Sequence, residues 1–176
     1  KSELYLGLQP KTYVGKAGEP VGFNLVALNP ESHPVAGRKV GLAFYQRSWY
    51  SVEEKREDGE FYWTSHYTDT LVAKSQVTTD AQGRASADFR PKTGGVHRLV
   101  ATPKDAAGNE ARSATYAWIT GGEGYINWRQ ENNDRIELVA DKKAYAPGET
   151  AEILVPAPFA GAQALVTIER GGIRDL

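Results

Sequence analysis

Apolar and polar residues alternate with a period of two in short runs along almost the whole chain. Such alternation places every second side chain on one face of a β-strand, whereas a helix needs apolar residues three and four positions apart. Gly, Pro, Asn and Asp interrupt the runs at short intervals, as turns require. The pattern therefore predicts an all-β fold, an antiparallel β-sandwich. The runs cover residues 4–8, 21–27, 40–44, 71–79, 85–89, 96–102 and 111–119.

The opening of this pattern recurs near the end of the chain. Residues 11–13 (Lys-Thr-Tyr) and 17–19 (Ala-Gly-Glu) lead into one alternating run. Residues 143–145 (Lys-Ala-Tyr) and 147–149 (Pro-Gly-Glu) lead into another, about 130 residues later. Gly at the third position of each turn is compatible with a type II turn, and Pro147 fits the position before it.

A second landmark recurs in the same order. Residues 34–37 (Pro-Val-Ala-Gly) precede the strand expected from Val40, and residues 158–161 (Pro-Phe-Ala-Gly) precede the strand expected from Ala164. Two matched landmarks indicate an internal repeat of one structural module.

The repeat predicts the domain organisation. Residues 1–120 are expected to form one complete sandwich, and residues 135–176 the first strands of a second module. Residues 121–134 between them begin with Gly-Gly-Glu-Gly, which suits a flexible linker. Because a partial sandwich leaves apolar faces and strand edges open, we expect residues 135–176 not to be stable alone.

Composition excludes several classes of protein. The formal net charge is −1 and 24% of residues are charged, which argues against a nucleic-acid surface or a polybasic membrane patch. The absence of cysteine removes disulfides, zinc thiolates and cysteine nucleophiles. No apolar run approaches the roughly 20 residues that span a bilayer. The sequence starts with neither Met nor an apolar signal core, so the native N-terminus is expected to lie upstream.

Residues that could carry chemistry do not form a recognisable site. His33, His66 and His97 lack metal-ligand spacing, and no Gly-x-Ser-x-Gly elbow is present. The loop at residues 105–109 lacks the acidic ladder of a calcium site, so we expect a hairpin turn there. We therefore expect no catalytic residue, metal or cofactor, and a protein that is not an enzyme.

One aromatic cluster is the candidate for binding. It flanks the polar residues 53–59, which are expected to form a solvated hairpin tip. Exposed aromatic side chains can stack on sugars or anchor a protein partner. Cross-strand pairing or packing against a neighbouring domain also explains them, and we favour inter-domain packing. The candidate contact residues are Trp49, Tyr50, Phe61, Tyr62, Trp63 and Tyr67.

Several segments resemble bacterial alpha-2-macroglobulins. The strongest lie at residues 141–151 (Asp-Lys-Lys-Ala-Tyr-Ala-Pro-Gly-Glu-Thr-Ala), 158–161 and 164–173 (Ala-Leu-Val-Thr-Ile-Glu-Arg-Gly-Gly-Ile). They are similar to the start of the macroglobulin-like domain that carries the bait region. Residues 79–85 and 95–101 fit the preceding module. The resemblance implies macroglobulin-like sandwiches, which share the architecture of immunoglobulin and fibronectin-III domains.

The resemblance also implies a function. In that family a protease cuts an exposed bait segment, and the domain array closes around the protease. This chain would then be a non-catalytic scaffold piece of a broad-spectrum endopeptidase inhibitor, in the periplasm or at the cell surface, with a membrane anchor upstream as one form of attachment. Its partners would be neighbouring macroglobulin-like domains and the target endopeptidases. The family's Cys-Gln thioester has no counterpart here, because the chain has no cysteine.

Two other classes of function remain open from the residues alone. A tandem immunoglobulin-like adhesin or stalk module would bind a surface partner and would need no protease-sensitive segment. A carbohydrate-binding sandwich attached to a hydrolase would use the aromatic cluster to stack sugars.

Overall fold

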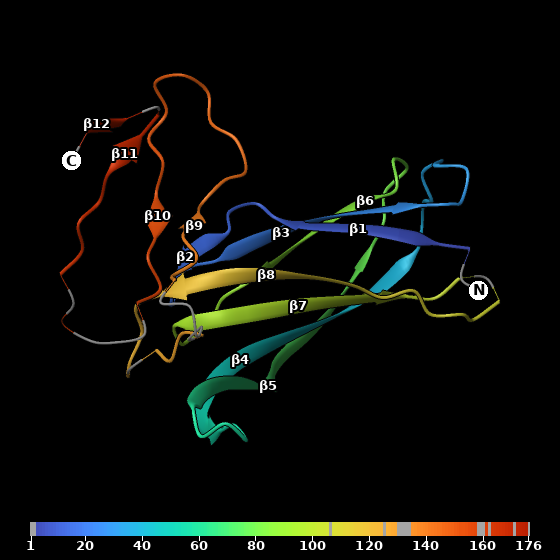
Figure 1. Cartoon of the computed structure of the whole chain (residues 1–176). Coiled ribbons are helices and arrows are strands. Elements are labelled where there is room, and N and C mark those ends of the chain that lie inside the picture. The colour runs from blue at the N-terminus through green and yellow to red at the C-terminus, as the bar shows by residue number, and fades with distance from the viewer. Residues whose placement is uncertain are drawn as a thin grey trace.

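Strands and turns, with no helix, make up the residues that the computed structural model describes, which are 3–105, 107–124, 126–129, 135–157, 161, 163–170 and 172–175. Eight strands over the first 120 residues form two packed layers (Figure 1). The predicted all-β sandwich is confirmed. The strands are β1 (Tyr5–Pro10), β2 (Val14–Lys16), β3 (Val21–Leu28), β4 (Lys39–Lys55), β5 (Phe61–Thr78), β6 (Arg84–Phe89), β7 (Gly95–Pro103) and β8 (Ser113–Thr120).

The two layers differ in size. One sheet has three strands in the order β1-β3-β6, and the other has five in the order β2-β8-β7-β4-β5. All neighbours are antiparallel except β2 and β8, which are parallel. The parallel pair arises because the chain changes sheets after β1. The Lys11 N–H still donates to Gly22 of β3 at 2.8 Å, and the carbonyl of Tyr13 already accepts from Trp118 of β8 at 2.8 Å.

The core lies between the sheets and follows the alternation of the sequence. Every second residue of β3 and of the first part of β4 is buried, as a strand with one covered face requires. Phe44 joins the layers, with its ring stacked on Phe89 at 4.6 Å and tilted against Phe23 at 5.9 Å. The core consists of Val21, Phe23, Leu25, Val40, Leu42, Phe44, Leu99, Ala101, Ala117 and Ile119.

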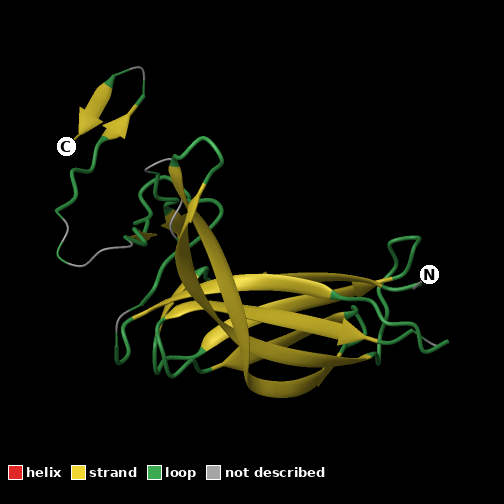
Figure 2. Ribbon diagram, turned by 60° about the horizontal axis from the view of Figure 1, so that its bottom comes forward, coloured by secondary structure: helices red, strands yellow, loops and turns green. Residues whose placement is uncertain are grey.

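The hairpin of β4 and β5 is longer than the alternation predicted. We expected a strand from Leu71, but β5 begins ten residues earlier at Phe61. Because β7 pairs with β4 only over Val40–Arg47, residues 48–55 and 61–68 pair with each other alone. We call these two segments the hairpin ribbon. Figure 2 shows the ribbon curving away from the sandwich.

A bulge in β5 sets the faces of this hairpin. Phe44 pairs with Ala73 but Tyr45 pairs with Leu71, so Val72 is an extra residue. An extra residue reverses which side chains face the core beyond it. As a result, Asp69 lies on the outer face of the five-stranded sheet, opposite Arg47.

Four tight loops share one geometry. In each, the first residue donates its N–H to the carbonyl of the fifth, and the fourth donates to the carbonyl of the first. The fourth residue has positive φ, which glycine adopts readily. The predicted hairpin turn at residues 105–109 is one of them. The loops begin at Asn29, Arg56, Asp80 and Asp105, with Ser32, Gly59, Gly83 and Gly108 at the positive-φ position.

The internal repeat is present in the backbone. Gly18 and Gly148 have φ of 85° and 86°, each in a turn closed by a 3.1 Å hydrogen bond. The predicted type II turns are confirmed. The bond from Lys11 to Gly22 recurs as one from Asp141 to Glu152, at 2.9 Å.

These matches share a single offset of 130 residues, which corrects part of the sequence alignment. The offset superposes Tyr13 on Lys143, whereas the Lys-x-Tyr landmark had paired Tyr13 with Tyr145. The tyrosines have different roles. The Tyr145 hydroxyl donates to the Asp141 carboxylate at 2.5 Å, inside the turn of the second module.

Residues 135–176 contain only short strands where the structure describes them. They are β9 (Val139–Ala140), β10 (Ile153–Leu154), β11 (Ile168–Glu169) and β12 (Ile173–Asp175). The strand expected from Ala164 is wrong, since described residues 163–167 are not in a strand. Apolar alternation needs a neighbouring strand and a facing sheet to become a strand, and the described residues supply neither there. Of the second repeat landmark, residues 158–160 lie outside the described residues.

The glycines after β8 have a conformational role. Gly121, Gly122 and Gly124 have φ of 71°, 89° and 90°, values that L side chains rarely adopt. A Cβ on Gly122 would lie 3.0 Å from the backbone of Gly94. Positive φ is therefore a reason for glycine at all three positions, and close approach to the sandwich is a second reason at Gly122.

Candidate functional site

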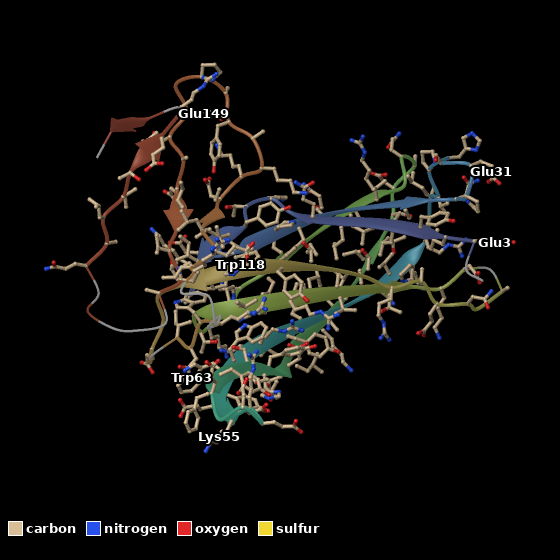
Figure 3. The ribbon with its side chains drawn as sticks, in the orientation of Figure 1. Glu3, Glu31, Lys55, Trp63, Trp118 and Glu149 are labelled. Carbon is tan, nitrogen blue, oxygen red and sulfur yellow. The ribbon has the colours of Figure 1, made fainter. Side chains whose placement is uncertain are left out.

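All six predicted contact residues lie on the two long strands β4 and β5. Strand alternation divides them between the two faces of the hairpin ribbon. Trp49, Tyr67, Trp63 and Phe61 share the face that continues the outside of the five-stranded sheet. Tyr50 and Tyr62 lie on the opposite face. Figure 3 shows Trp63 and Lys55 at the end of this hairpin, well away from Trp118 of β8.

The structure brings some of these residues together as cross-strand pairs. Trp49 packs edge-on against Tyr67 with ring centroids 5.3 Å apart. Tyr50 stacks on His66 at 5.4 Å, and the Tyr62 hydroxyl donates to Glu54 at 2.5 Å. This bond raises the pKa of Tyr62. These pairs leave most of the side chains accessible to solvent. The exposed fractions of Trp63, Tyr67, Tyr50 and Phe61 are 40–63%.

At the base of the ribbon, Arg47 makes a bidentate ion pair and lies against several aromatic rings. Its Nε and Nη2 donate to the two Asp69 carboxylate oxygens at 2.7 and 2.8 Å. Its guanidinium carbon lies 3.6 Å from the Tyr67 ring centroid and 5.2 Å from that of Tyr116. Arg98 adds a second cation, 3.3 Å from Asp69. We call these five residues and Trp49 the Arg47 cluster.

The Arg47 cluster is held by four strands, and its central Arg47–Asp69 pair is largely withdrawn from water. The Arg47 and Asp69 side chains are 8% and 17% exposed. The hydrogen bond from Arg47 lowers the pKa of Asp69, and the same bond raises the pKa of Arg47. A bidentate Arg–carboxylate pair fixes orientation as well as charge. The pair therefore links β4 and β5 at the point where the ribbon leaves the sheet.

A cavity of about 250 Å³ opens beside the Arg47 cluster. One wall is the outer face of the sheet, and the other is the segment that leads into the second module. Its volume is below the roughly 300–1,000 Å³ typical of small-molecule sites, so we interpret it as a crevice between the sandwich and the segment that follows it. The lining residues are Arg47, Trp49, Val96, Tyr116, Trp118, Trp128, Arg129, Arg135, Ile136, Glu137, Val139 and Pro156.

Direct contacts connect the sandwich to the chain that follows it. The Tyr13 N–H donates to the Asp141 carbonyl at 2.9 Å, and the Thr12 hydroxyl lies 3.3 Å from the same oxygen. Lys143 lies over the Tyr13 ring at 5.7 Å, and Arg129 lies over Trp49 at 5.6 Å. Trp49 of the predicted contact set is therefore in contact with the segment between the modules.

Sequence reasoning missed most of this interface. Tyr116 and Trp118 carried a usable signal, because they alternate with the buried Ala117 and Ile119 and so must lie on the outer face. Large aromatic side chains on an outer face indicate that something covers it. Arg47 and Asp69 carried no such signal, because their encounter depends on the bulge at Val72.

The histidines are spread over separate parts of the fold. His33 lies in a loop, and His66 stacks on Tyr50. His97 is buried in β7, and its burial lowers its pKa. Among the described residues, no group of three or more His, Cys, Asp or Glu side chains is placed to hold a metal ion.

A family model described as bacterial macroglobulin domain 6 matches residues 7–118, which is most of the sandwich. The chain belongs to the bacterial alpha-2-macroglobulin family. The alpha-2-macroglobulin homolog of Nostoc sp. is 26% identical over 162 residues. The alpha-2-macroglobulin of Pasteurella multocida is 26% identical over 166 residues.

Solved structures agree on the macroglobulin fold. Alpha-2-macroglobulin of E. coli in its native conformation matches 86% of the chain, with a TM-score of 0.59 and 16% identity. Salmonella alpha-2-macroglobulin reacted with methylamine matches 89%, with a TM-score of 0.52 and 15% identity. At these identities the likeness shows the fold alone.

This macroglobulin chain is short beside its relatives. The alignments with the Nostoc and Pasteurella proteins cover 92–93% of this chain but only 8% of the length of each relative. It is therefore homologous to one region of an alpha-2-macroglobulin-like protein. The described residues include no helix long and apolar enough to cross a membrane.

Proposed function

We propose that this chain is a non-catalytic scaffold piece of a bacterial alpha-2-macroglobulin-like inhibitor that traps a broad range of endopeptidases. Family membership supports the type of protein, and the contacts between the modules support the mechanical role. The single observation that carries the proposal is the joint between Tyr13 and Asp141 beside the aromatic crevice.

A trap needs parts that move and parts that keep their shape. Cleavage of one peptide bond can shift a two-state assembly only if strain is held until the cut and then transmitted. The main-chain hydrogen bond from Tyr13 to Asp141 and the cations Lys143 and Arg129 over the rings of Tyr13 and Trp49 stiffen the joint. In this proposal the two modules move as one unit when the array closes.

The domain arrangement is part of the proposal. Residues 1–120 would be one macroglobulin-like sandwich, residues 121–134 a connecting segment, and residues 135–176 the start of the domain that carries the bait region. The backbone repeat at an offset of 130 residues supports a second module of the same fold. Its other strands would come from elsewhere in the complete polypeptide.

The test uses the complete polypeptide and a panel of endopeptidases of different specificity. Each reaction is followed by mapping the cut sites and by small-angle X-ray scattering. We expect every protease to cut first in one short segment outside residues 1–176, after which the particle compacts and the protease loses activity on large substrates. First cuts scattered over several segments, with an unchanged particle shape, would refute the trap and favour an adhesin or stalk.

The cellular location of the complete polypeptide is part of the same proposal. A protein that intercepts foreign proteases would act in the periplasm or at the cell surface. Fractionation of cells that make the complete polypeptide, with a cytoplasmic enzyme as control, tests this. Recovery in the cytoplasmic fraction would contradict it.

A further inference from the structure

The hairpin ribbon extends beyond the sheet that supports it. Residues 48–55 and 61–68 pair only with each other, and a lone two-stranded hairpin is marginally stable in water. Its rings stay open on both faces, with Phe61 63% exposed and Tyr50 53% exposed. Exposed apolar side chains gathered on one element indicate a contact surface.

The base of the ribbon is fixed before any partner arrives. The Arg47 cluster ties β4, β5, β7 and β8 together through the bidentate bond to Asp69 and the rings of Tyr67 and Tyr116. A pre-organised element loses less conformational entropy on binding than a flexible one. A rigid base therefore suits an arm that docks.

Charge at the tip selects the chemistry of the partner. Residues 53–60 contain five carboxylates and two cations, a net charge of −3. Both cations lie over rings of the ribbon itself, Lys55 over Phe61 at 5.7 Å and Arg56 over Tyr62 at 5.2 Å. Potentials across a specific interface are complementary, so the partner surface is basic around an apolar groove.

The same charge argues against other partners. In a two-fold dimer through the ribbon, two acidic tips would come close together and repel. Anionic lipid headgroups and nucleic-acid phosphates would be repelled as well.

We infer that the hairpin ribbon inserts the aromatic side chains of both its faces into an apolar groove on another domain of the same polypeptide. Lys and Arg side chains border that groove. The relatives are about twelve times as long as this chain, since it covers 8% of their length. Domains joined in one chain meet at a high effective concentration. This inference needs only that longer polypeptide, so it can fail or hold independently of protease trapping.

Photo-crosslinking in the complete, uncleaved polypeptide tests the inference. Two variants carry p-benzoylphenylalanine in place of Phe61 or of Tyr50. The control carries it in place of Val72, which is 43% exposed on the same strand but outside the ribbon. We expect both ribbon sites to cross-link within one polypeptide to a single surface outside residues 1–176, at higher yield than the control. Cross-links between two copies, or no excess over Val72, would overturn the inference.

A charge variant tests the nature of that surface. Glu57→Lys should lower the Phe61 cross-linking yield by about threefold, because the reversed charge repels a basic partner. Glu31→Lys, at the opposite end of the sandwich from Lys55 (Figure 3), is the matched control and should leave the yield unchanged. Equal effects of the two variants would refute a basic partner. Circular dichroism of each variant checks that the fold is intact.

Discussion

At the scale of single residues, one buried ion pair and one buried histidine stand out. Arg47 and Asp69 face each other on the outside of the five-stranded sheet, where charged side chains usually reach water. Aromatic rings cover them, so the pair is withdrawn from solvent and well aligned. His97 lies inside the sandwich, with its ring 5.7 Å from Phe89.

Removing the carboxylate of the Arg47 cluster should destabilise the chain. Asp69→Asn leaves the Arg47 charge buried without its bidentate partner, and we expect the free energy of unfolding to fall by about 2–3 kcal/mol. Urea denaturation at pH 7 measures the change. Asp88→Asn, which removes an exposed 4.0 Å contact with Lys11, should cost less than about 0.5 kcal/mol.

The stability difference between wild type and Asp69→Asn should also depend on pH. Because Arg47 lowers the pKa of Asp69, the stabilisation is complete above the unfolded-state value of about 3.9 and is lost as pH falls through the lower folded-state value. The difference between wild type and Asp69→Asn should therefore shrink below about pH 4. A difference that is constant from pH 7 to pH 3 would contradict this assignment.

His97 should make stability depend on pH in a higher window. Its lowered pKa means that, below about pH 6.5, the unfolded state binds the proton more readily than the folded state. Wild-type stability should fall between pH 7.5 and pH 5.5, and His97→Gln should remove much of that fall. His33→Gln, in an exposed loop, should retain it. Parallel behaviour of the two variants would exclude His97 as the source.

At the scale of elements, the four matched loops show how the chain reverses direction. Each needs a positive φ at its fourth residue, and three of them place glycine there. The loop at residues 29–33 uses Ser32 at φ 65° instead. The Asn29 side chain accepts from the N–H groups of Glu31 and His33 at 3.1 and 2.8 Å, as the carboxylates of Asp80 and Asp105 do at the equivalent positions of their loops.

Ser32→Gly should therefore stabilise the sandwich. Glycine relieves the strain of the left-handed backbone at this position. This gain should exceed the entropic cost of a more flexible unfolded chain, so we expect the free energy of unfolding to rise by up to about 1 kcal/mol. Thermal unfolding measures it. Gly83→Ala is the opposing control, since a Cβ there would lie 2.6 Å from the Ala27 carbonyl at φ 68°. A destabilised Ser32→Gly would show that the hydroxyl matters more than the backbone.

At the scale of the whole molecule, the sandwich and residues 135–176, the proposed second module, differ in how much apolar surface they cover. The sandwich has a continuous core between its sheets. The described part of the second module exposes Leu138, Ile153, Leu165, Val166 and Ile168 by 55–84%. Its strands have two or three residues, too few to bury a core of their own.

Residues 135–176 expressed alone should therefore lack a stable fold. We expect narrow amide dispersion in the NMR spectrum of that fragment, whereas residues 1–120 should give a well-dispersed spectrum. Good dispersion from residues 135–176 would mean that the short strands suffice without the contacts to Thr12 and Tyr13.

The sequence alone determined the class of fold, most of the core and the turns. Period-two alternation and turn residues act locally, so the buried faces of β3 and β4 and the turns at Gly18 and Gly148 could be predicted from neighbouring residues. The aromatic cluster was also recognised, although its role stays a prediction.

Only the tertiary structure decided the arrangement on the outer face. The bulge at Val72 places Asp69 opposite Arg47, and the limited reach of β7 leaves the ribbon unsupported. The true offset of the repeat likewise depends on main-chain pairing rather than on the Lys-x-Tyr letters. These features arise from contacts between strands that are distant in sequence. The alternation of apolar residues does not determine the register between such strands.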